Sequence, residues 1–254
     1  MILDKFQLTG KVAIVTGASR GLGQGIAIGL AEAGADIALV ARTKAALEQT
    51  AAAIQKVGRK ALVVLVDLKG ATEADRVVQE TLKGLGRVDI LLNVAGTQVR
   101  KPFFEMTEQD YEYLMSVNLK ALFFISQAAS KEMAKQSKGK IINITSLTSF
   151  IGISNISLYT ASKGAVASLT RQFAVELAKH NIQCNAIGPG YFRTELTEAL
   201  FQDPEKAKWV LSKIPMGRTG VPEDLVGAAV FLASAASDYI TGQIVNVDGG
   251  WLSA

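Results

Sequence analysis

The sequence has 254 residues, of which 49% are hydrophobic and 20% charged, and its formal net charge is +4. A chain of this length can build a large core within one α/β domain. The mild charge comes without a basic run, which argues against nucleic-acid binding. A single cysteine excludes an internal disulfide.

No apolar run reaches the roughly 18 residues of a membrane span. The first residues lack the basic start and the hydrophobic stretch of a secretory signal. We therefore expect a cytoplasmic protein that acts on a small molecule and binds neither a membrane nor a nucleic acid.

Short apolar runs alternate with helical patterns along the whole chain. Buried strands are predicted at residues 11–16, 37–41, 61–66, 88–92, 140–145, 181–187 and 243–247, and helices at 45–57, 72–85, 107–135 and 222–233 among others. A capping pattern opens the helix at Thr72. The alternation predicts a single domain, residues 1–254, built on a doubly wound parallel sheet that binds ligands beyond the C-terminal ends of its strands.

A glycine-rich turn follows the first predicted strand. Residues 16–23 (TGASRGLG) lead into a helical pattern that stops at Gly34. A strand, a glycine turn and a helix in this order place helix N-terminal amides against a phosphate, and glycine lets the backbone approach the ligand closely. The turn favours a nucleotide site, although its spacing differs from that of the usual dinucleotide fingerprint.

The end of the second predicted strand lacks the acidic residue that holds the ribose of NAD. Arg42 and Thr43 stand there instead, and Ser19 and Arg20 lie in the glycine turn. Two arginines and two hydroxyls could surround a 2′-phosphate, so we predict NADP(H). Either arginine alone would be interpreted as a surface charge. Asp67 ends the third strand and could accept a hydrogen bond from adenine or serve as a cap or turn residue.

Tyr159 and Lys163 lie four residues apart in a predicted helix, on one face and about one turn from each other. A tyrosine has an ordinary pKa near ~10. We expect the lysine ammonium to lower this pKa by favouring the phenolate, which makes the pair a proton donor and acceptor. The spacing alone also fits an ordinary amphipathic helix. Ser146 ends the fifth predicted strand, and the loop 147–157 could bring it to the start of this helix.

Four further features of the chain bear on its function. Asn118 lies in an apolar helical stretch and must bind either backbone or a water. Cys184 alternates within a strand and is expected in the core. The single histidine, His180, follows a helix end, so a histidine-dependent hydrolase and a zinc site both lack support. Residues 191–216 lie beyond a strand end and are predicted to form a lid over the ligand.

The glycine turn, residues 93–96 (NVAG), Asn118, Ser146 and the pair Tyr159 and Lys163 together resemble the short-chain dehydrogenase/reductase family, of the compact type. The resemblance covers essentially the whole chain, with one departure at Val94, where the family motif usually has asparagine. It implies a seven-stranded Rossmann-like sheet and the nicotinamide-dependent interconversion of an alcohol and a ketone.

The resemblance also implies a role for each of these residues. Tyr159 would be the general acid and base, Ser146 would steady the substrate carbonyl, and Asn118 would hold a water of the proton relay. Lys163 would bind the nicotinamide ribose and lower the pKa of the tyrosine. The residues expected to bind the cofactor are Gly17, Ser19, Arg20, Gly21, Leu22, Gly23, Arg42, Asp67, Leu68, Asn93, Ala95, Gly96, Tyr159, Lys163, Pro189, Gly190, Phe192 and Thr194. Among them, Asp67 would contact the adenine, Asn93 the adenosine ribose and Thr194 the carboxamide.

Several stretches narrow the resemblance within the family. Residues 98–103, 179–182, 190–197 and 247–251 are similar to gluconate 5-dehydrogenases, and residues 1–4 and 21–27 to 2-dehydro-3-deoxygluconate 5-dehydrogenases. Both act on sugar acids, and 3-oxoacyl carrier-protein reductases share much of the pattern. We expect a keto or hydroxy sugar acid as the substrate, with Gln98, Arg100 and Ser149 as candidate contacts.

Two expectations concern assembly and the alternative class of protein. The family commonly forms tetramers, so we expect a homotetramer in which Trp251 and Leu252 take part in a subunit contact. A non-catalytic nucleotide-binding protein on the same fold is the least favoured alternative, since Ser146, Tyr159 and Lys163 are all present.

Overall fold

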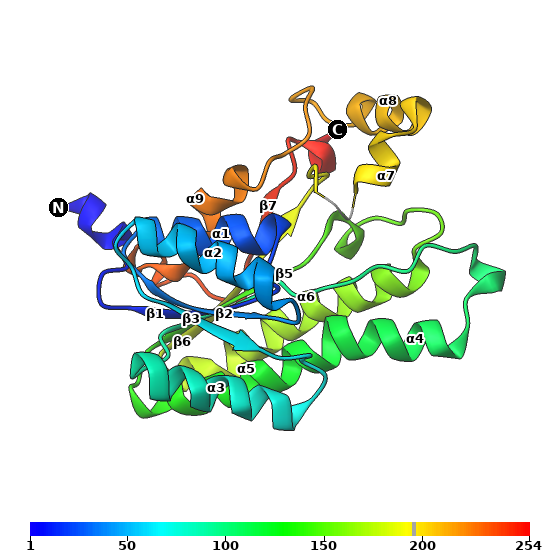
Figure 1. The fold of residues 1–254 in the computed structure, drawn as a ribbon. Coiled ribbons are helices and arrows are strands. Elements are labelled where there is room, and N and C mark those ends of the chain that lie inside the picture. The colour runs from blue at the N-terminus through cyan, green and yellow to red at the C-terminus, as the bar shows by residue number, and fades with distance from the viewer. Residues whose placement is uncertain (195–196) are drawn as a thin grey trace.

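The computed structural model describes residues 1–194 and 197–254. Seven parallel strands form one sheet in the order β3-β2-β1-β4-β5-β6-β7, and helices cover both of its faces (Figure 1). The strands are β1 (Val12–Thr16), β2 (Asp36–Ala41), β3 (Ala61–Leu65), β4 (Ile90–Asn93), β5 (Gly139–Ile144), β6 (Ile182–Pro189) and β7 (Ile244–Val247). The helices are α1 (Gly21–Glu32), α2 (Lys44–Lys56), α3 (Ala71–Leu85), α4 (Glu108–Met115), α5 (Ala121–Lys135), α6 (Ser157–Leu177), α7 (Glu198–Phe201), α8 (Pro204–Ser212) and α9 (Glu223–Ala233). The predicted doubly wound parallel sheet is confirmed.

The strand order places the ligand crevice. The first three strands run outward from β1 to β3, and the chain then returns to pair β4 with the other side of β1. Ligands of such sheets bind where the order reverses, beyond the C-terminal ends of the strands. The glycine turn after β1 and residues 93–96 after β4 meet at this point.

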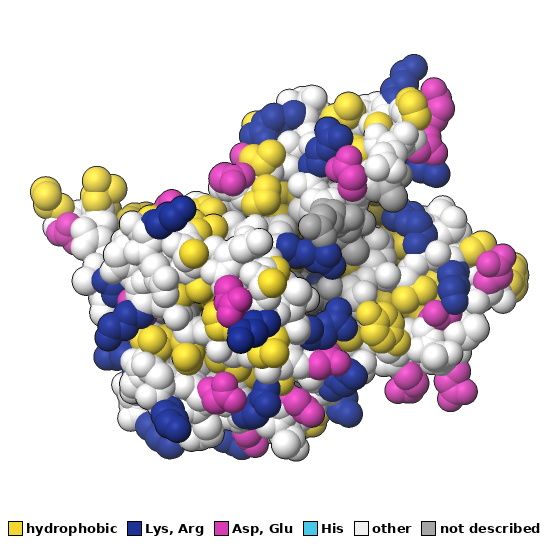
Figure 2. All heavy atoms as spheres, in the orientation of Figure 1, with side chains coloured by type: hydrophobic (Ala, Val, Ile, Leu, Met, Phe, Trp, Pro, Cys, Tyr) yellow, Lys and Arg dark blue, Asp and Glu magenta, His cyan; other side chains and the backbone are white. Residues whose placement is uncertain are grey.

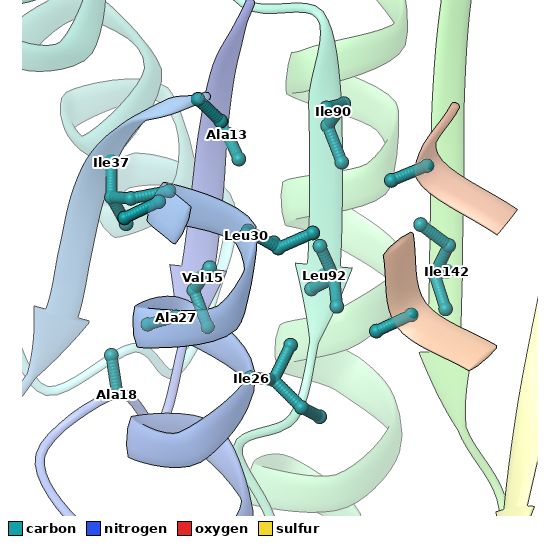
Figure 3. Close-up of a cluster of buried hydrophobic side chains, with 14 of the residues drawn as sticks. Ala13, Val15, Ala18, Ile26, Ala27, Leu30, Ile37, Ile90, Leu92 and Ile142 are labelled. Carbon is teal, nitrogen blue, oxygen red and sulfur yellow. The ribbon is translucent and has the colours of Figure 1, made fainter. Parts of the chain in front are cut away.

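Successive strand residues point to opposite faces of the sheet. Val15 of β1 and Leu92 of β4 face α1, where Ile26 packs against the same cluster (Figure 3). Ile14 and Leu91, one residue earlier on the same strands, join a second cluster with α3, α5 and α6. The central strands are therefore buried on both faces, as their continuous apolar runs predict.

The third strand departs from its prediction. β3 pairs only with β2 at the edge of the sheet. Of its five residues Val64 alone is fully buried, and Leu65 is 46% exposed. The prediction of a fully buried strand was wrong here, because an apolar run does not reveal which strand lies at an edge.

The predicted cap of α3 was also wrong. The helix begins at Ala71 after Gly70, so Thr72 lies inside the first turn and no side chain caps the helix. A true capping box occurs at α4, where the Thr107 hydroxyl accepts a hydrogen bond from the Asp110 amide at 3.1 Å and the Asp110 carboxylate accepts one from the Thr107 amide at 3.0 Å.

The long helix predicted at residues 107–135 is interrupted by a wide turn. α4 and α5 are joined by a π-helical turn, Ser116–Lys120, which contains the buried Asn118. Single π-turns inside helices often occur at functional sites. None of the helices in residues 1–194 and 197–254 combines the length and the hydropathy that a membrane crossing requires.

The segment predicted as a lid carries α7 and α8, which lie beside the C-terminus and apart from the helices that cover the sheet (Figure 1). Two of its residues, Glu195 and Leu196, lie outside the described residues. Trp251 is only 7% exposed, and its ring lies 5.6 Å from that of Trp209 on α8. The Trp251 side chain is thus buried within its own chain, whereas Leu252 is partly exposed, and the expected subunit contact of these two residues stays a prediction.

Candidate active site

The glycine turn between β1 and α1 has no room for side chains at two positions. Gly17 has a φ of +68°, and a Cβ on it would lie 2.9 Å from the Ala95 nitrogen. A Cβ on Gly23 would lie 2.2 Å from the carbonyl oxygen of Gly17. Both close approaches require glycine, and they bring the start of α1 against the turn.

The first turn of α1 is suited to a phosphate. Its N-cap residue, Arg20, gives it no side-chain hydrogen bond, so the N-terminal amides and the positive end of the helix dipole can serve an anion. Ser19 is partly buried in the turn, and Leu22 packs against the core beneath it. Gly21 lies opposite the lid segment, since a Cβ on it would be 3.6 Å from Cγ2 of Thr194.

The loop after β4 is tied to the glycine turn by a threonine. The Thr16 hydroxyl accepts hydrogen bonds from the Val94 amide at 3.0 Å and from the Ala95 amide at 3.1 Å. Val94 departs from the family motif, but its backbone amide still fixes the turn through the hydrogen bond to Thr16. Asn93 is 3% exposed, and its amide nitrogen donates to Ser126 and Asn143, each at 2.9 Å. Its side chain is therefore held between β5 and α5, away from the crevice, and only its backbone remains for the expected ribose contact.

Tyr159 and Lys163 lie one turn apart at the start of α6, as predicted. Lys163 is 5% exposed; its Nζ lies 5.7 Å from the centre of the Tyr159 ring and donates a hydrogen bond to the Ile144 carbonyl at 2.7 Å. The Ser149 hydroxyl donates to the Lys163 carbonyl at 2.9 Å. These bonds join the end of β5 to α6 and bring Ser146, two residues beyond β5, to the tyrosine.

The pKa of Tyr159 differs from the prediction. Burial raises it above the ordinary value, and a hydrogen bond with Ser146 lowers it in part. The predicted lowering by Lys163 was wrong for this structure, because the ammonium is directed to the Ile144 carbonyl and lies beside the tyrosine ring. Burial also lowers the pKa of Lys163, from 10.5 to about 8.

Asn118 joins three parts of the site. Its oxygen accepts from the Thr97 amide at 2.8 Å, and its nitrogen donates to the Thr97 carbonyl at 2.9 Å and to the Ser162 hydroxyl at 3.1 Å. Ser162 in turn donates to the Tyr159 carbonyl at 2.8 Å. Both amide hydrogens of Asn118 are used within the protein, as expected if this residue binds backbone groups. A relay water would therefore have to bind an oxygen of Asn118. A Cβ on Gly96 would lie 3.5 Å from the Asn118 oxygen and 3.7 Å from the Lys163 ammonium.

The strand ends at β2 and β3 border a second part of the crevice. Arg42 and Asp67 are exposed and line one pocket. Asp67 pairs with Lys69 at 2.8 Å and precedes the start of α3, so it is not a helix cap. Leu68 is partly buried against the core.

Sequence reasoning missed Arg76, which lines the same pocket from α3. It donates to the Leu65 carbonyl at 2.5 Å and lies 3.5 Å from Glu80. No motif marks this arginine. Only its place about two turns into a helix that follows a strand end could have drawn attention to it.

The segment after β6 reaches the crevice mainly through its backbone. A Cβ on Gly190 would lie 2.7 Å from the Asp248 Cα. Phe192 is 4% exposed and packs against Gly220 and the core, so of this expected cofactor residue only the backbone is free for a ligand. Pro189, the last residue of β6, is buried beside them.

The three expected substrate contacts differ in how accessible their side chains are. Gln98 is partly buried, Arg100 is exposed, and the Ser149 hydroxyl is already used on the Lys163 carbonyl. Figure 2 shows a hollow between the lobe of α7 and α8 and the body of the molecule, with lysine and arginine side chains along its edge. Positive charge at this opening suits an anionic substrate.

The comparisons with known proteins agree with this geometry. The family profile described as enoyl-(acyl carrier protein) reductase matches residues 17–252. The chain is 46% identical to the 2-dehydro-3-deoxy-D-gluconate 5-dehydrogenase of Dickeya dadantii (strain 3937), covering 100% of both. It is 42% identical to the 5-keto-D-gluconate 5-reductase of Escherichia coli (strain K12), covering 99% of both. The solved structure of a gluconate 5-dehydrogenase from Burkholderia cenocepacia J2315, in complex with NADP and tartrate, is 40% identical, with a TM-score of 0.96 and 100% of both chains covered.

The chain belongs to the short-chain dehydrogenase/reductase family.

The predicted family resemblance and the Rossmann-like sheet are thereby confirmed. The family roles expected for Asn118, Ser146, Tyr159 and Lys163, and for the cofactor residues, stay predictions. Within the described part of the chain no group of histidine, cysteine and acidic residues could hold a metal ion.

The two remaining expectations about single residues can be compared with the structure. Cys184 is fully buried in the second core, and burial raises the pKa of its thiol, so the prediction of a core residue is confirmed. His180 ends the short helical turn after α6 and is partly exposed. It lies just before the start of β6, whereas the site lies at the C-terminal ends of the strands.

The lowered pKa of Lys163 predicts how stability depends on pH. The unfolded chain keeps the lysine proton up to pH 10.5, whereas the folded protein releases it near pH 8. Between these values the unfolded state binds more protons, so the free energy of unfolding increases as pH rises. Relative to Lys163→Met, the unaltered protein should gain about 3 kcal/mol from pH 8 to pH 10.5 in urea unfolding. All other titrations cancel in this difference, and a difference that stays constant with pH contradicts the lowered pKa.

Proposed function

We propose that the protein transfers a hydride between NADP(H) and a keto or hydroxy sugar acid, in the manner of a gluconate 5-dehydrogenase. The observation that carries the proposal is the arrangement of Tyr159, Lys163 and Ser146 at the strand ends, beside a glycine turn shaped for a dinucleotide. The names of the relatives supply the class of substrate.

The protein's own residues would bind and orient the reactants. Gly17 and Gly23 form a turn that an added Cβ would fill, and this turn and the start of α1 fit the pyrophosphate of the cofactor. Thr194 lies over Gly21 and fits the nicotinamide end. The nicotinamide, when bound, supplies or accepts the hydride.

Proton transfer would fall to the phenol of Tyr159. Because burial raises its pKa, the phenol is protonated at neutral pH and suited to donate to the oxygen of a ketone. The Ser146 hydroxyl would donate a hydrogen bond to the same oxygen. The Lys163 ammonium, held by the Ile144 carbonyl beside the tyrosine ring, would bind the ribose of the nicotinamide and so orient the cofactor.

The substrate would be held as an anion. The charge of Arg100 lowers the pKa of the Tyr191 phenol, which supports a position for the guanidinium beside the lid segment. An exposed arginine there suits the carboxylate of a sugar acid. A 3-oxoacyl thioester has no carboxylate at the corresponding end, and a non-catalytic protein would not need the tyrosine, lysine and serine together.

The function is tested by following NADPH oxidation with 5-ketogluconate, with NADH as the matched cofactor. Tyr159→Phe should lower kcat by roughly 100-fold or more, because a positioned general acid contributes about that much. The dissociation constant for NADPH should not change, since the ring remains. A variant as active as the unaltered protein contradicts the proposed acid. A protein that binds NADPH but reduces only 3-deoxy sugar acids with a ketone at C5, or acetoacetyl thioesters, belongs to a different branch of the family.

We propose NADP(H) rather than NAD(H) because Arg42 lies where an acidic residue would hold an unmodified ribose. Arg42→Asp should lower kcat/KM for NADPH by roughly 10- to 100-fold, the worth of a charge-assisted contact, and should leave NADH less affected. Lys56→Asp, at the far end of α2, makes the same change in net charge and is the control. An unchanged ratio of the two cofactors contradicts the role of Arg42.

We also propose a cytoplasmic homotetramer in which α5 and α6 form one contact. Phe123 is 36% and Val175 76% exposed on these helices, and the Phe123 ring lies 5.8 Å from that of Phe173. Large apolar side chains exposed on neighbouring helices support an interaction surface there. Light scattering should give the mass of four chains, and Phe123→Glu should lower it, whereas Val57→Glu, directly after α2, should not. A monomeric unaltered protein contradicts the proposal.

A further inference from the structure

Tyr191 is the first residue of the lid segment. It follows Gly190 and lies two residues beyond Pro189, the end of β6. Its side chain is partly buried, and its ring lies 5.0 Å from that of Trp251, tilted by 37°. This separation is that of a stacked aromatic pair. The ring of Tyr191 is thus held against a buried tryptophan.

The tryptophan is itself firmly placed by the C-terminal segment. The Asp248 carboxylate accepts hydrogen bonds from the Gly250 amide at 2.9 Å and from the Leu252 amide at 3.0 Å. The Gly249 carbonyl accepts one from the Met216 amide at 3.1 Å, which ties this segment to the end of the lid. Trp251 therefore forms a fixed support beneath Tyr191.

The same support reaches the loop of the reacting serine. Trp251 shares a small buried cluster with Val210 and Ile214 of the lid and with Leu147, the residue after Ser146. Tyr191 packs against this cluster. The lid, the C-terminal segment and the serine loop are therefore packed as one unit, and Tyr191 lies at its edge, in the same cluster as the residue after Ser146.

The Tyr191 phenol is within electrostatic range of both the Tyr159 phenol and the Arg100 guanidinium. It is near enough to Tyr159 to raise the pKa of that phenol, and the charge of Arg100 lowers the pKa of Tyr191 in turn. No hydrogen bond of the Tyr191 hydroxyl occurs among the described residues, although it is half-buried. A polar group in such a position is suited to a polar group of the substrate.

We propose that Tyr191 contacts the substrate, its hydroxyl forming a hydrogen bond with a hydroxyl of the sugar-acid chain close to the reacting carbon. Trp251 is the positioning residue that fixes its ring. The proposal rests on the proposed function for the class of substrate, and it goes beyond that function by naming the group that selects polyhydroxy chains. A site built to bond a hydroxyl discriminates against chains that lack it.

The test uses a complex that cannot react, the protein with NADP⁺ and 5-ketogluconate. Tyr191→Phe keeps the stack on Trp251 and removes only the oxygen. The dissociation constant for 5-ketogluconate should rise roughly 3- to 10-fold, the worth of one neutral hydrogen bond, while that for NADP⁺ and the midpoint of thermal unfolding should not change. Tyr111→Phe, at a tyrosine 46% exposed on α4, is the matched control.

The outcomes separate this proposal from the function on which it rests. Unchanged binding of 5-ketogluconate by Tyr191→Phe, with normal binding by the unaltered protein, overturns the role of Tyr191 and leaves the function intact. Loss of NADP⁺ affinity or of thermal stability in Tyr191→Phe overturns it too, because the role would then be structural. No binding of 5-ketogluconate by the unaltered protein overturns both.

Discussion

Lys163 places a positive charge where almost no water reaches it. Among the described residues its ammonium has one hydrogen-bond partner, the carbonyl of Ile144, and no carboxylate lies against it. Burying an unpaired charge costs several kcal/mol, and the protein meets part of this cost by lowering the pKa of the lysine to about 8. A set of ribose hydroxyls beside the ammonium would compensate the rest. The energetic cost of the buried ammonium is thus explained by its role in the proposed reaction.

The contact with Ile144 also explains why the site has its geometry. Ile144 is the last residue of β5, so the lysine fixes α6 to the strand that carries Ser146. Asn118 adds the loop after β4 through Thr97 and the first turns of α6 through Ser162. Two of these three bonds end on backbone carbonyls. The positions of the reacting side chains are therefore consequences of how the strands and α6 are joined.

This dependence on backbone explains how much the sequence could predict. Parallel strands buried on both faces leave continuous apolar runs, so the sheet and its functional edge follow from the pattern. Tyr159 and Lys163 share a helix face by spacing alone. The pKa of the tyrosine could not be foreseen in the same way, since it depends on burial and on the direction in which the ammonium points.

The sequence also could not predict where several side chains point. Asn93 and Phe192 stand at positions expected to meet the cofactor, yet one side chain is held between β5 and α5 and the other lies in the core. Arg76 reaches the crevice from α3 without any motif. In each case the outcome depends on segments distant in sequence. A motif places a residue in the fold, but the neighbours of that residue decide whether its side chain or its backbone meets a ligand.

The two ends of the crevice are therefore specified by different physics. The cofactor end is shaped by close backbone approaches at Gly17 and Gly23, where any added Cβ collides, so few changes are compatible with the fold. The substrate end is formed by side chains, with Tyr191 resting on Trp251 and Arg100 exposed nearby. A side chain there can change while the sheet and the glycine turn remain. This division lets a family keep one hydride-transfer site and vary the ketone it accepts, and under the role we propose for Tyr191 the specificity of this chain would depend on the support beneath that ring.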